Sequence, residues 1–299
     1  MKKFIKSFLP CKNQWPLFLL RSRLMADYKR RYGYKMDIKN PKTFTEKLQW
    51  YKLYFKGDGH LERIVDKYLF KDYIKEHLGE GYTIPLLGTW TDINQLEKDW
   101  HTLPEEFCLK STLQSDGNCI KFIHNKSSIQ FDTIKKELKE WLNPKKTLIN
   151  SFCKAYYNAT PRILAEKYLE NIKNQLFDYK IFCFDGNPYC VYVATEHFDR
   201  NDYPITFYNL LWEKMDVKYG DHDTADTPKP KHLDEMIEIS KNLSQGFPFI
   251  RVDFFDTKEK LLLAEMTLYP GGGFTPYHPK SFNEFLGKKF ELPIYNNYD

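Results

Sequence analysis

The sequence predicts an α+β fold of two lobes that follow an N-terminal helical extension. Three observations lead to this prediction: helical patterns over residues 22–78, short strands alternating with helices up to about residue 170, and two β-hairpins in the remainder. At 299 residues, the chain is long enough for two or three lobes that each bury a core. We expect an N-terminal helical extension, an N-terminal α/β subdomain, a small lobe and a large lobe, over residues 1–60, 61–105, 106–170 and 171–299.

The first elements are predicted to be helices. Residues 22–54 are basic and aromatic, and we expect them to form helices docked on the main body. Asn40-Pro41 indicates a turn, and Thr43 to Glu46 has the residue types of a helix start. We predict a further helix over Leu61 to Leu78, because apolar residues recur there at near-helical spacing and Gly79 follows the last of them.

Shorter patterns follow, in which strands and helices alternate. A polar loop at residues 111–118 separates two of the predicted strands, and Asn143-Pro144 ends a predicted helix. The strands are expected at 83–90, 107–110, 119–123 and 162–169, and the helices at 92–100 and 131–142.

Two hairpins give the strongest local signals in the sequence. The first turns at Asp185-Gly186-Asn187-Pro188, which has the residue types that a tight turn needs. A polar loop and a predicted helix at residues 233–243 lead to the second hairpin. The four strands are expected at 179–184, 189–195, 249–255 and 261–268.

The second hairpin gathers charged side chains on one face. Because side chains alternate along a strand, Arg251 and Asp253 share a face, as do Glu265 and Thr267 on the partner strand. A turn centred near Glu259 puts Asp253 opposite Glu265, where two carboxylates would repel each other. Something positive should lie between them, either Arg251 or a magnesium ion shared with phosphate oxygens. A solvated or arginine-paired acidic hairpin is the alternative.

Lys110 ends a predicted strand directly before the polar loop. A lysine there can reach a phosphate while backbone N–H groups of the loop close over the anion. The loop has neither the P-loop pattern nor the dinucleotide-binding pattern, so an exposed strand-end lysine is the alternative. Gly271 to Gly273 are expected to form a flexible turn rather than a phosphate-binding loop.

Taken in chain order, these pieces resemble the parts of an ATP-grasp enzyme. Within that superfamily the sequence is similar to the TupA-like family, which is named for teichuronopeptide synthesis and found among polysaccharide-synthesis proteins. The similarity covers about residues 40–279. It is carried by Asp66-Lys67-Tyr68, Ile84-Pro85-Leu86-Leu87-Gly88, Leu103-Pro104-Glu105-Glu106-Phe107 and the run EMTLYPGGGF at residues 265–274.

The resemblance implies two α+β lobes that clasp ATP, with a role for each matching residue. Lys110 would contact the nucleotide phosphates, and the loop with Ser115, Gly117 and Asn118 would cover them. Backbone groups of a hinge strand would bind adenine, and this strand consists of Glu166, Lys167, Tyr168 and Leu169.

By the same resemblance, the second hairpin and its neighbour would handle the transferred phosphoryl group. Lys180 and Arg251 would neutralise its charge, and Asp253, Glu265 and Thr267 would hold magnesium ions. Thr267 stands where the family pattern has asparagine, so a hydroxyl replaces an amide oxygen. The covering loop also contains fewer glycines than the usual version.

The implied activity is that of a carboxylate-amine ligase, in which ATP phosphorylates a carboxylate and an amine then attacks the acyl phosphate. We expect a glycan acceptor, such as a hexuronic acid in a capsule or O-antigen, an amino acid as the amine, and no nucleic-acid partner. Two alternatives remain, a kinase that uses the same nucleotide site and a glycosyltransferase that binds a nucleotide sugar. Asp221-His222-Asp223 matches the D-x-D pattern of glycosyltransferases by its letters but falls in a polar loop.

Composition excludes an integral membrane protein, because no stretch approaches the roughly 18 uninterrupted apolar residues of a membrane span. We expect a cytoplasmic protein, since prolines and polar residues interrupt the apolar N-terminus and none of the six cysteines forms a C-x-x-C pair. The net charge of +5 is concentrated near the N-terminus. Lys2 to Leu9 suit peripheral contact with an anionic membrane, and a docked or disordered tail fits equally well.

Overall fold

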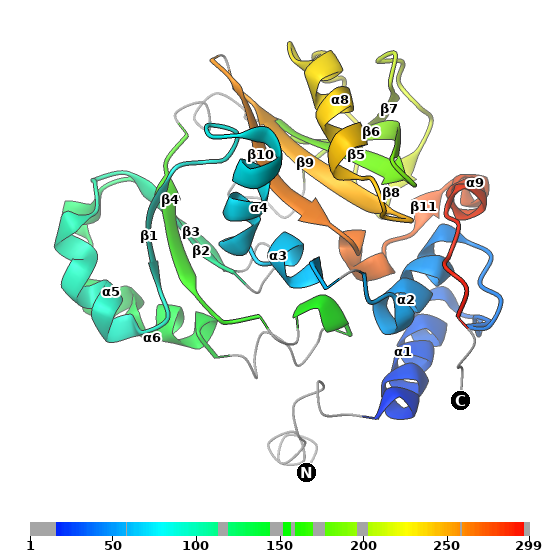
Figure 1. Ribbon diagram of the computed structural model, residues 1–299, viewed down its shortest axis with the longest axis horizontal. Coiled ribbons are helices and arrows are strands. Elements are labelled where there is room, and N and C mark those ends of the chain that lie inside the picture. Colours follow the sequence, from blue (N-terminus) through cyan, green and yellow to red (C-terminus); the bar gives the residue numbers. More distant parts are fainter. Residues whose placement is uncertain are drawn as a thin grey trace.

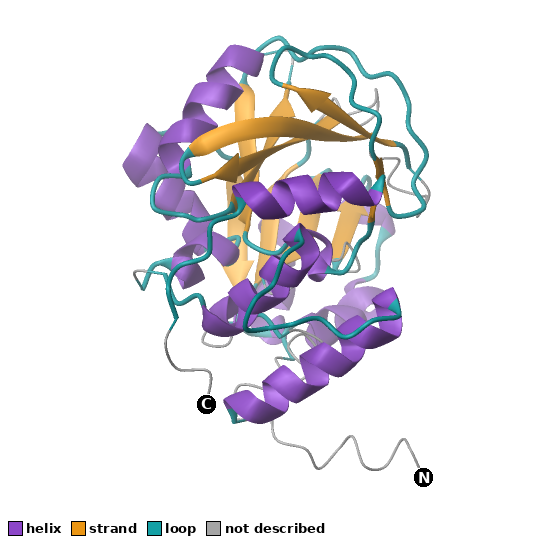
Figure 2. Cartoon of the chain, turned by 90° about the vertical axis from the view of Figure 1, so that its right-hand side faces the viewer, coloured by secondary structure: helices purple, strands orange, loops and turns teal. Residues whose placement is uncertain are grey.

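The computed structural model contains two antiparallel sheets side by side (Figure 1). The smaller sheet has four strands in the order β1-β4-β2-β3, and the larger has five in the order β10-β9-β5-β6-β7. Seen from the side, the strands form the centre and the helices lie around them (Figure 2). The structure describes residues 16–57, 59–112, 119–143, 152–156, 159–169, 177–195, 203–257 and 259–295.

The N-terminal residues form helices, as predicted, and α2 packs on the larger sheet. Thr43 starts α2 with a capping box, in which its side chain accepts a hydrogen bond from the Glu46 N–H and Glu46 accepts one from the Thr43 N–H. Phe44 then packs edge-on against Phe249 of the larger lobe, with ring centroids 4.8 Å apart. The two helices are α1 (Leu17–Tyr32) and α2 (Phe44–Tyr54).

The single helix predicted over Leu61 to Leu78 is wrong, because the structure has two helices there. Asp66 is in an extended conformation, and its carboxylate accepts hydrogen bonds from the Tyr68 and Leu69 N–H groups. A side chain that caps backbone donors in this way starts a new helix. The segments are α3 (Leu61–Val65) and α4 (Leu69–Leu78), and we call residues 66–68 the elbow.

The smaller sheet and the helices against it match the predicted alternation. Its core contains Phe107, Leu109 and Ile163, none of which is exposed to solvent, and Leu96 and Leu138 pack on them from the two helices. The elements are β1 (Leu86–Trp90), α5 (Ile93–Asp99), β2 (Phe107–Ser111), β3 (Ile120–Ile123), α6 (Phe131–Trp141) and β4 (Ile163–Lys167), with short 3-10 turns at Trp100–Thr102, Lys126–Ser128 and Lys154–Tyr156.

The larger sheet contains both predicted hairpins. The first turns through Asp185 and Gly186, at φ of 48° and 73°, the left-handed pair that joins two strands across a two-residue loop. Its strands and helix are β5 (Phe177–Phe184), β6 (Asn187–Thr195), α8 (Leu233–Leu243), β9 (Ile250–Asp256) and β10 (Leu261–Thr267). Four further elements were not predicted from the sequence: β7 (Ile205–Asn209), β8 (Lys218–Tyr219), β11 (Tyr277–His278) and α9 (Lys280–Lys289).

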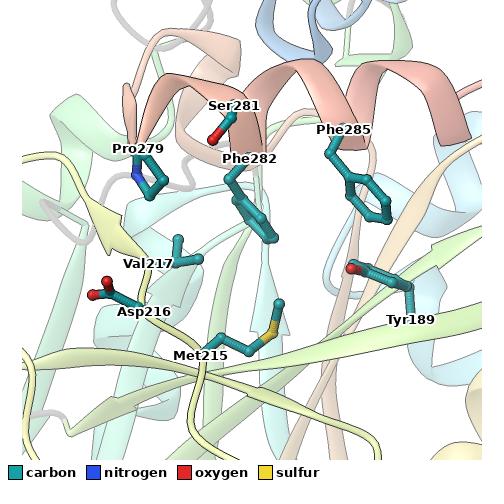
Figure 3. Close-up of a pocket in the computed structure, with 8 residues that line it drawn as sticks. All are labelled: Tyr189, Met215, Asp216, Val217, Pro279, Ser281, Phe282 and Phe285. Atoms are coloured by element: carbon teal, nitrogen blue, oxygen red, sulfur yellow. The ribbon is translucent and has the colours of Figure 1, made fainter.

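A hollow of about 430 Å³ lies on the outer side of this lobe, beside α9 (Figure 3). Phe282 and Phe285 of α9 face Met215 and Tyr189 across it, and Asp216 is its one charged lining residue. None of the residues in the charged clusters described below lines this hollow, so it is not part of the candidate site.

Candidate active site

The second hairpin pairs as the sequence predicted, with Asp253 opposite Glu265 and Arg251 opposite Thr267. A β-bulge between Leu263 and Glu265 makes this register possible, because the strand residues nearer the turn pair one position out of step with it. The charged side chains therefore meet on one face of β9 and β10.

Arg251 fills the position between the two carboxylates. Its Nε donates to Asp253 Oδ1 at 2.7 Å, and its Nη2 donates to Glu265 Oε1 at 3.2 Å and to Thr267 Oγ1 at 3.1 Å. Of the two cations expected there, the structure shows the guanidinium. We call this set, together with Lys180 and Asp178, the large-sheet cluster.

Lys180 adds a second cation from the neighbouring strand β5. Its Nζ donates to Asp253 Oδ2 at 3.0 Å and also to Asp178. Burial disfavours a charged lysine here, but the two aspartates outweigh burial and raise the Lys180 pKa above its ordinary value. The ammonium therefore stays charged, and Asp253, which is fully buried, has both oxygens bonded to cations.

Glu265 is the most accessible acid of this cluster. Its side chain is 26% exposed, and Lys67 of the elbow approaches Glu265 Oε2 at 3.6 Å. Burial opposes ionisation of Glu265, but Lys67, Arg251 and Lys180 outweigh it and lower the Glu265 pKa to about 2. An ionised, partly exposed carboxylate is a ligand that magnesium prefers. Glu265 fits a metal ligand, whereas the buried Asp253 acts as a counter-ion in this arrangement.

Within the described residues, no group of three or more His, Cys, Asp or Glu side chains could hold a metal ion by itself. A magnesium ion carried between one or two carboxylates and phosphate oxygens needs no such group. The roles of Asp253, Glu265 and Thr267 as metal ligands stay a prediction.

A second charged cluster lies on the smaller sheet, and we call it the small-sheet cluster. Glu166 of β4 forms ion pairs with Lys110 of β2, with Nζ and Oε2 2.7 Å apart, and with Lys71 of α4, with Nζ and Oε1 2.5 Å apart. Burial opposes ionisation of Glu166, but the two lysines outweigh it and lower the Glu166 pKa to about 2. Lys110 is thus not a solvated strand-end lysine, and Lys71 is a site residue that the sequence analysis missed.

The rest of the predicted hinge follows Glu166 along β4. Lys167 is exposed and ends the strand, and its backbone N–H donates to Pro85 O at 2.9 Å. Tyr168 is buried with its ring 5.1 Å from that of His124, and Leu169 is half-buried. Ser115, Gly117 and Asn118, predicted to cover the nucleotide, lie outside the described residues.

The elbow contacts both sheets: Asp66 pairs with Arg162 beside β4 of the smaller sheet, and Lys67 approaches Glu265 of the larger sheet. Asp66 is fully buried and pairs with Arg162 at the start of β4, with Oδ2 and Nη1 2.9 Å apart. Arg162 O in turn accepts from the Thr112 N–H, and the Arg162 N–H donates to Thr112 Oγ1, in the last described residue before the predicted covering loop. Lys67, which follows Asp66 in the chain, lies near Glu265. In Figure 1 the two helices joined by the elbow lie between the sheets.

The Gly271 to Gly273 segment is a 3-10 turn fixed to α2, in contrast to the flexible turn expected. Gln49 Nε2 donates to Gly273 O at 2.5 Å, and the buried Lys52 donates to Gly272 O. All three glycines have positive φ, which explains why side chains are absent there. The turn directly follows the strand that carries Glu265 and Thr267.

Comparison with protein-family models finds one match, to the family described as TupA-like ATPgrasp, over residues 46–291. The chain belongs to this family. The match covers both charged clusters, the elbow and the glycine turn, and it confirms the predicted ATP-grasp fold. A search of curated proteins finds no match.

Solved structures similar to this TupA-like protein include D-alanine–D-alanine ligases. The Bacillus anthracis enzyme is 15% identical at a TM-score of 0.40, over 69% of this chain and 57% of that one. The Helicobacter pylori enzyme is 18% identical at 0.41, over 83% and 68%. An N5-carboxyaminoimidazole synthetase from Staphylococcus aureus, complexed with ADP, is 15% identical at 0.41, over 77% and 53%. The chain thus spans little more than half the length of two of them.

The structure brings the predicted site residues that it describes together in two groups. Lys110 and Glu166 meet on the smaller sheet, and Lys180, Arg251, Asp253, Glu265 and Thr267 meet on the larger one. Lys67 and Lys71 were not among the site residues predicted from the sequence. The Asp66-Lys67-Tyr68 motif was the available signal, because an aspartate shortly before an apolar helical run can accept hydrogen bonds from the first N–H groups of that helix.

Proposed function

We propose that this TupA-like ATP-grasp protein is a carboxylate-amine ligase of surface polysaccharide biosynthesis. It would couple ATP hydrolysis to an amide bond between a glycan carboxylate, such as that of a hexuronic acid, and an amine such as an amino acid. The observation that supports it best is a pair of cation-containing clusters, one on each sheet, with Lys67 of the elbow contacting one and Lys71 of the following helix α4 belonging to the other.

The clusters supply what phosphoryl transfer demands, which is fixed positive charge. Lys71 and Lys110 are held in place by Glu166 on one sheet, and Arg251 and Lys180 by Asp253 on the other. Side chains fixed in this way need little reorganisation when charge develops on a transferred group. No step requires a nucleophilic side chain.

The proposed reaction has two steps. In the first, a carboxylate oxygen of the acceptor attacks the γ-phosphorus of ATP, the bond from that phosphorus to the bridging oxygen breaks, and ADP leaves. In the second, the amine nitrogen attacks the acyl carbon, the bond from that carbon to the phosphate oxygen breaks, and the amine gives up a proton as phosphate leaves. Arg251 and Lys180 would neutralise the transferred phosphoryl group, and Lys110 and Lys71 would orient the remaining phosphates.

Magnesium, when bound with ATP, would neutralise phosphate charge and align its oxygens. Glu265 would be its principal protein ligand because it is ionised and the most accessible acid of the large-sheet cluster. Thr267 Oγ1 accepts from Arg251 and lies 2.8 Å from Glu265 Oε1, so the hydroxyl fixes the position of that carboxylate.

The test is a thermal-shift series followed by product analysis. Mg-ATP is expected to raise the melting temperature, and ATP with a chelator is not, because only a ligand of the folded state stabilises it. ADP and phosphate release should then require both a uronic acid and an amine, and the product mass should show an amide. A phosphorylated product formed without amine would mean a kinase. A shift with nucleotide sugars alone would mean a glycosyltransferase and would overturn the site assignment.

A further inference from the structure

We propose that the outward face of α1 docks on an anionic lipid bilayer. The first observation is the division of charge along the chain. Residues 1–40 contain eleven Lys and Arg against two Asp, a formal charge of +9, whereas the whole chain carries +5, so residues 41–299 carry −4. The excess positive charge of this protein thus belongs to its N-terminal part alone.

The second observation is the way α1 is built. One face, with Leu20, Leu24 and Tyr28, is buried against the body of the protein. The opposite face begins with two apolar side chains exposed to solvent, Phe18 at 57% and Leu19 at 43%. No residue in the described part of the chain covers these two adjacent side chains.

Cations follow the apolar pair on the same outward face. Arg23, Lys29 and Arg30 are exposed, and the one acid among them, Asp27, is already bonded to Arg30 at 2.9 Å and lies 3.7 Å from Arg23. An apolar tip beside a row of cations is the pattern of helices that lie in the headgroup region of a membrane. The apolar side chains enter the acyl boundary and the cations meet lipid phosphates.

The position of α1 in the molecule permits this contact. The helix lies at the outer edge in both views, apart from the strands of the two sheets (Figures 1 and 2). The sequence before α1 has the same mixture of apolar and basic residues, with Phe4, Ile5, Phe8 and Leu9 among Lys2, Lys3 and Lys6. No helix of the described chain is long and apolar enough to cross a bilayer, so the contact is with the surface.

The test is co-sedimentation of the full chain with vesicles of phosphatidylcholine alone or mixed with phosphatidylglycerol. Binding is expected only to the mixed vesicles and should weaken in 0.5 M salt. The triple variant Arg23→Gln, Lys29→Gln, Arg30→Gln should bind about a hundredfold more weakly, since each cation near an anionic surface contributes roughly a factor of five. Phe18→Ser with Leu19→Ser should lower the binding that persists in salt by about tenfold.

The matched control removes three exposed cations from the helices of the smaller lobe, as Lys98→Gln, Lys136→Gln, Lys139→Gln. If this control variant binds the mixed vesicles within twofold of the parent protein, the result supports docking through the α1 face. An equal loss of binding in both triple variants would show that the vesicles attract positive charge anywhere on the protein, and it would overturn the proposal. Three other results would overturn the proposal. The first is no binding to mixed vesicles, and the second is a loss of binding on substituting Lys2, Lys3 and Lys6 but not the α1 residues. The third is a dimer in solution that dissociates in the Phe18 and Leu19 variant.

Thermal melts of each variant distinguish misfolding from lost binding. None of these measurements depends on ligase activity.

Discussion

Asp253 is the residue of the large-sheet cluster whose negative charge we expect to contribute most to stability. It is fully buried and bonds both Arg251 and Lys180, which are themselves at most 9% exposed. Removing one partner of a buried pair leaves an uncompensated charge in a medium that solvates it poorly. This role is structural, and it adds to any contact that Asp253 makes with a metal.

We therefore predict that Asp253→Asn lowers the free energy of unfolding by about 3–5 kcal/mol. The measurement is urea denaturation at pH 7. The control is Asp226→Asn, which breaks the exposed ion pair with Lys214 and should change stability by less than about 0.5 kcal/mol. Equal stability of Asp253→Asn and the parent protein would show that the two cations do not depend on this carboxylate.

Glu265→Gln should separate binding from folding. Because Glu265 is partly exposed and Arg251 keeps Asp253 as a partner, we expect a stability loss of about 1 kcal/mol, smaller than for Asp253→Asn. The same variant should lose the magnesium-dependent part of ATP binding. Calorimetric titration with ATP, in magnesium and in chelator, provides the measurement. An undiminished magnesium dependence would remove Glu265 from the metal site.

At the scale of elements, the elbow shows what a hydrophobic pattern leaves out. The apolar spacing over Leu61 to Leu78 continues through the break, so it predicts one helix. The break is made instead by Asp66, which caps the second helix and pairs with Arg162 nearly a hundred residues later. Such a pairing has no local signature. The register of the second hairpin was predictable because alternation and turn position are local, although the bulge beside Glu265 was not.

The elbow gives Lys67 a role that can be tested. Lys67→Gln removes the cation nearest to Glu265 on its open side but leaves the elbow's cap intact, because Asp66 makes the cap. We predict a fall in ligase kcat of about a hundredfold, typical of losing one charge contact to a transition state, with little change in melting temperature. Lys75→Gln, which changes an exposed lysine of the adjoining helix α4, is the matched control. Equal kcat in the two variants would exclude Lys67 from the site.

The α9 helix was missed because its apolar residues are few, and its place in the fold depends on a close approach to α2. A β-carbon on Gly287 would lie 2.2 Å from Lys42 O and 2.9 Å from Phe44 N, both backbone atoms that cannot swing aside. We predict that Gly287→Ala destabilises the protein by about 1–3 kcal/mol despite the better helix propensity of alanine. Glu284→Ala, on the exposed side of α9, should stay within about 0.5 kcal/mol. Chemical denaturation compares the two, and a stabilised Gly287→Ala would show that the helices can separate.

For the whole molecule, the two glutamates at the centres of the clusters make the free energy of unfolding depend on pH in the acidic range. Glu166 lies in one sheet and Glu265 in the other, and neighbouring cations lower both pKa values from 4.5 to about 2. A carboxyl whose pKa is lower in the folded state adds stability that is complete above about pH 4.5 and is lost as the pH falls towards 2. Burial raises the pKa of Asp66, so this carboxyl acts on stability in the opposite direction.

We accordingly predict that the free energy of unfolding falls between pH 5 and pH 3. Over the full titration the loss should reach up to about 3 kcal/mol for the buried Glu166, and about 1 kcal/mol for Glu265, whose partial exposure lets solvent screen its ion pairs. Urea midpoints at pH 7, 5, 4 and 3 measure it. Glu265→Gln lacks one of the two titrating groups, so its stability should fall less steeply over the same interval, even though it starts from a lower value at pH 7. Parallel curves for this variant and the parent protein would mean that the large-sheet cluster does not hold Glu265 ionised, and the electrostatic basis of the proposed phosphoryl-transfer site would fail with it.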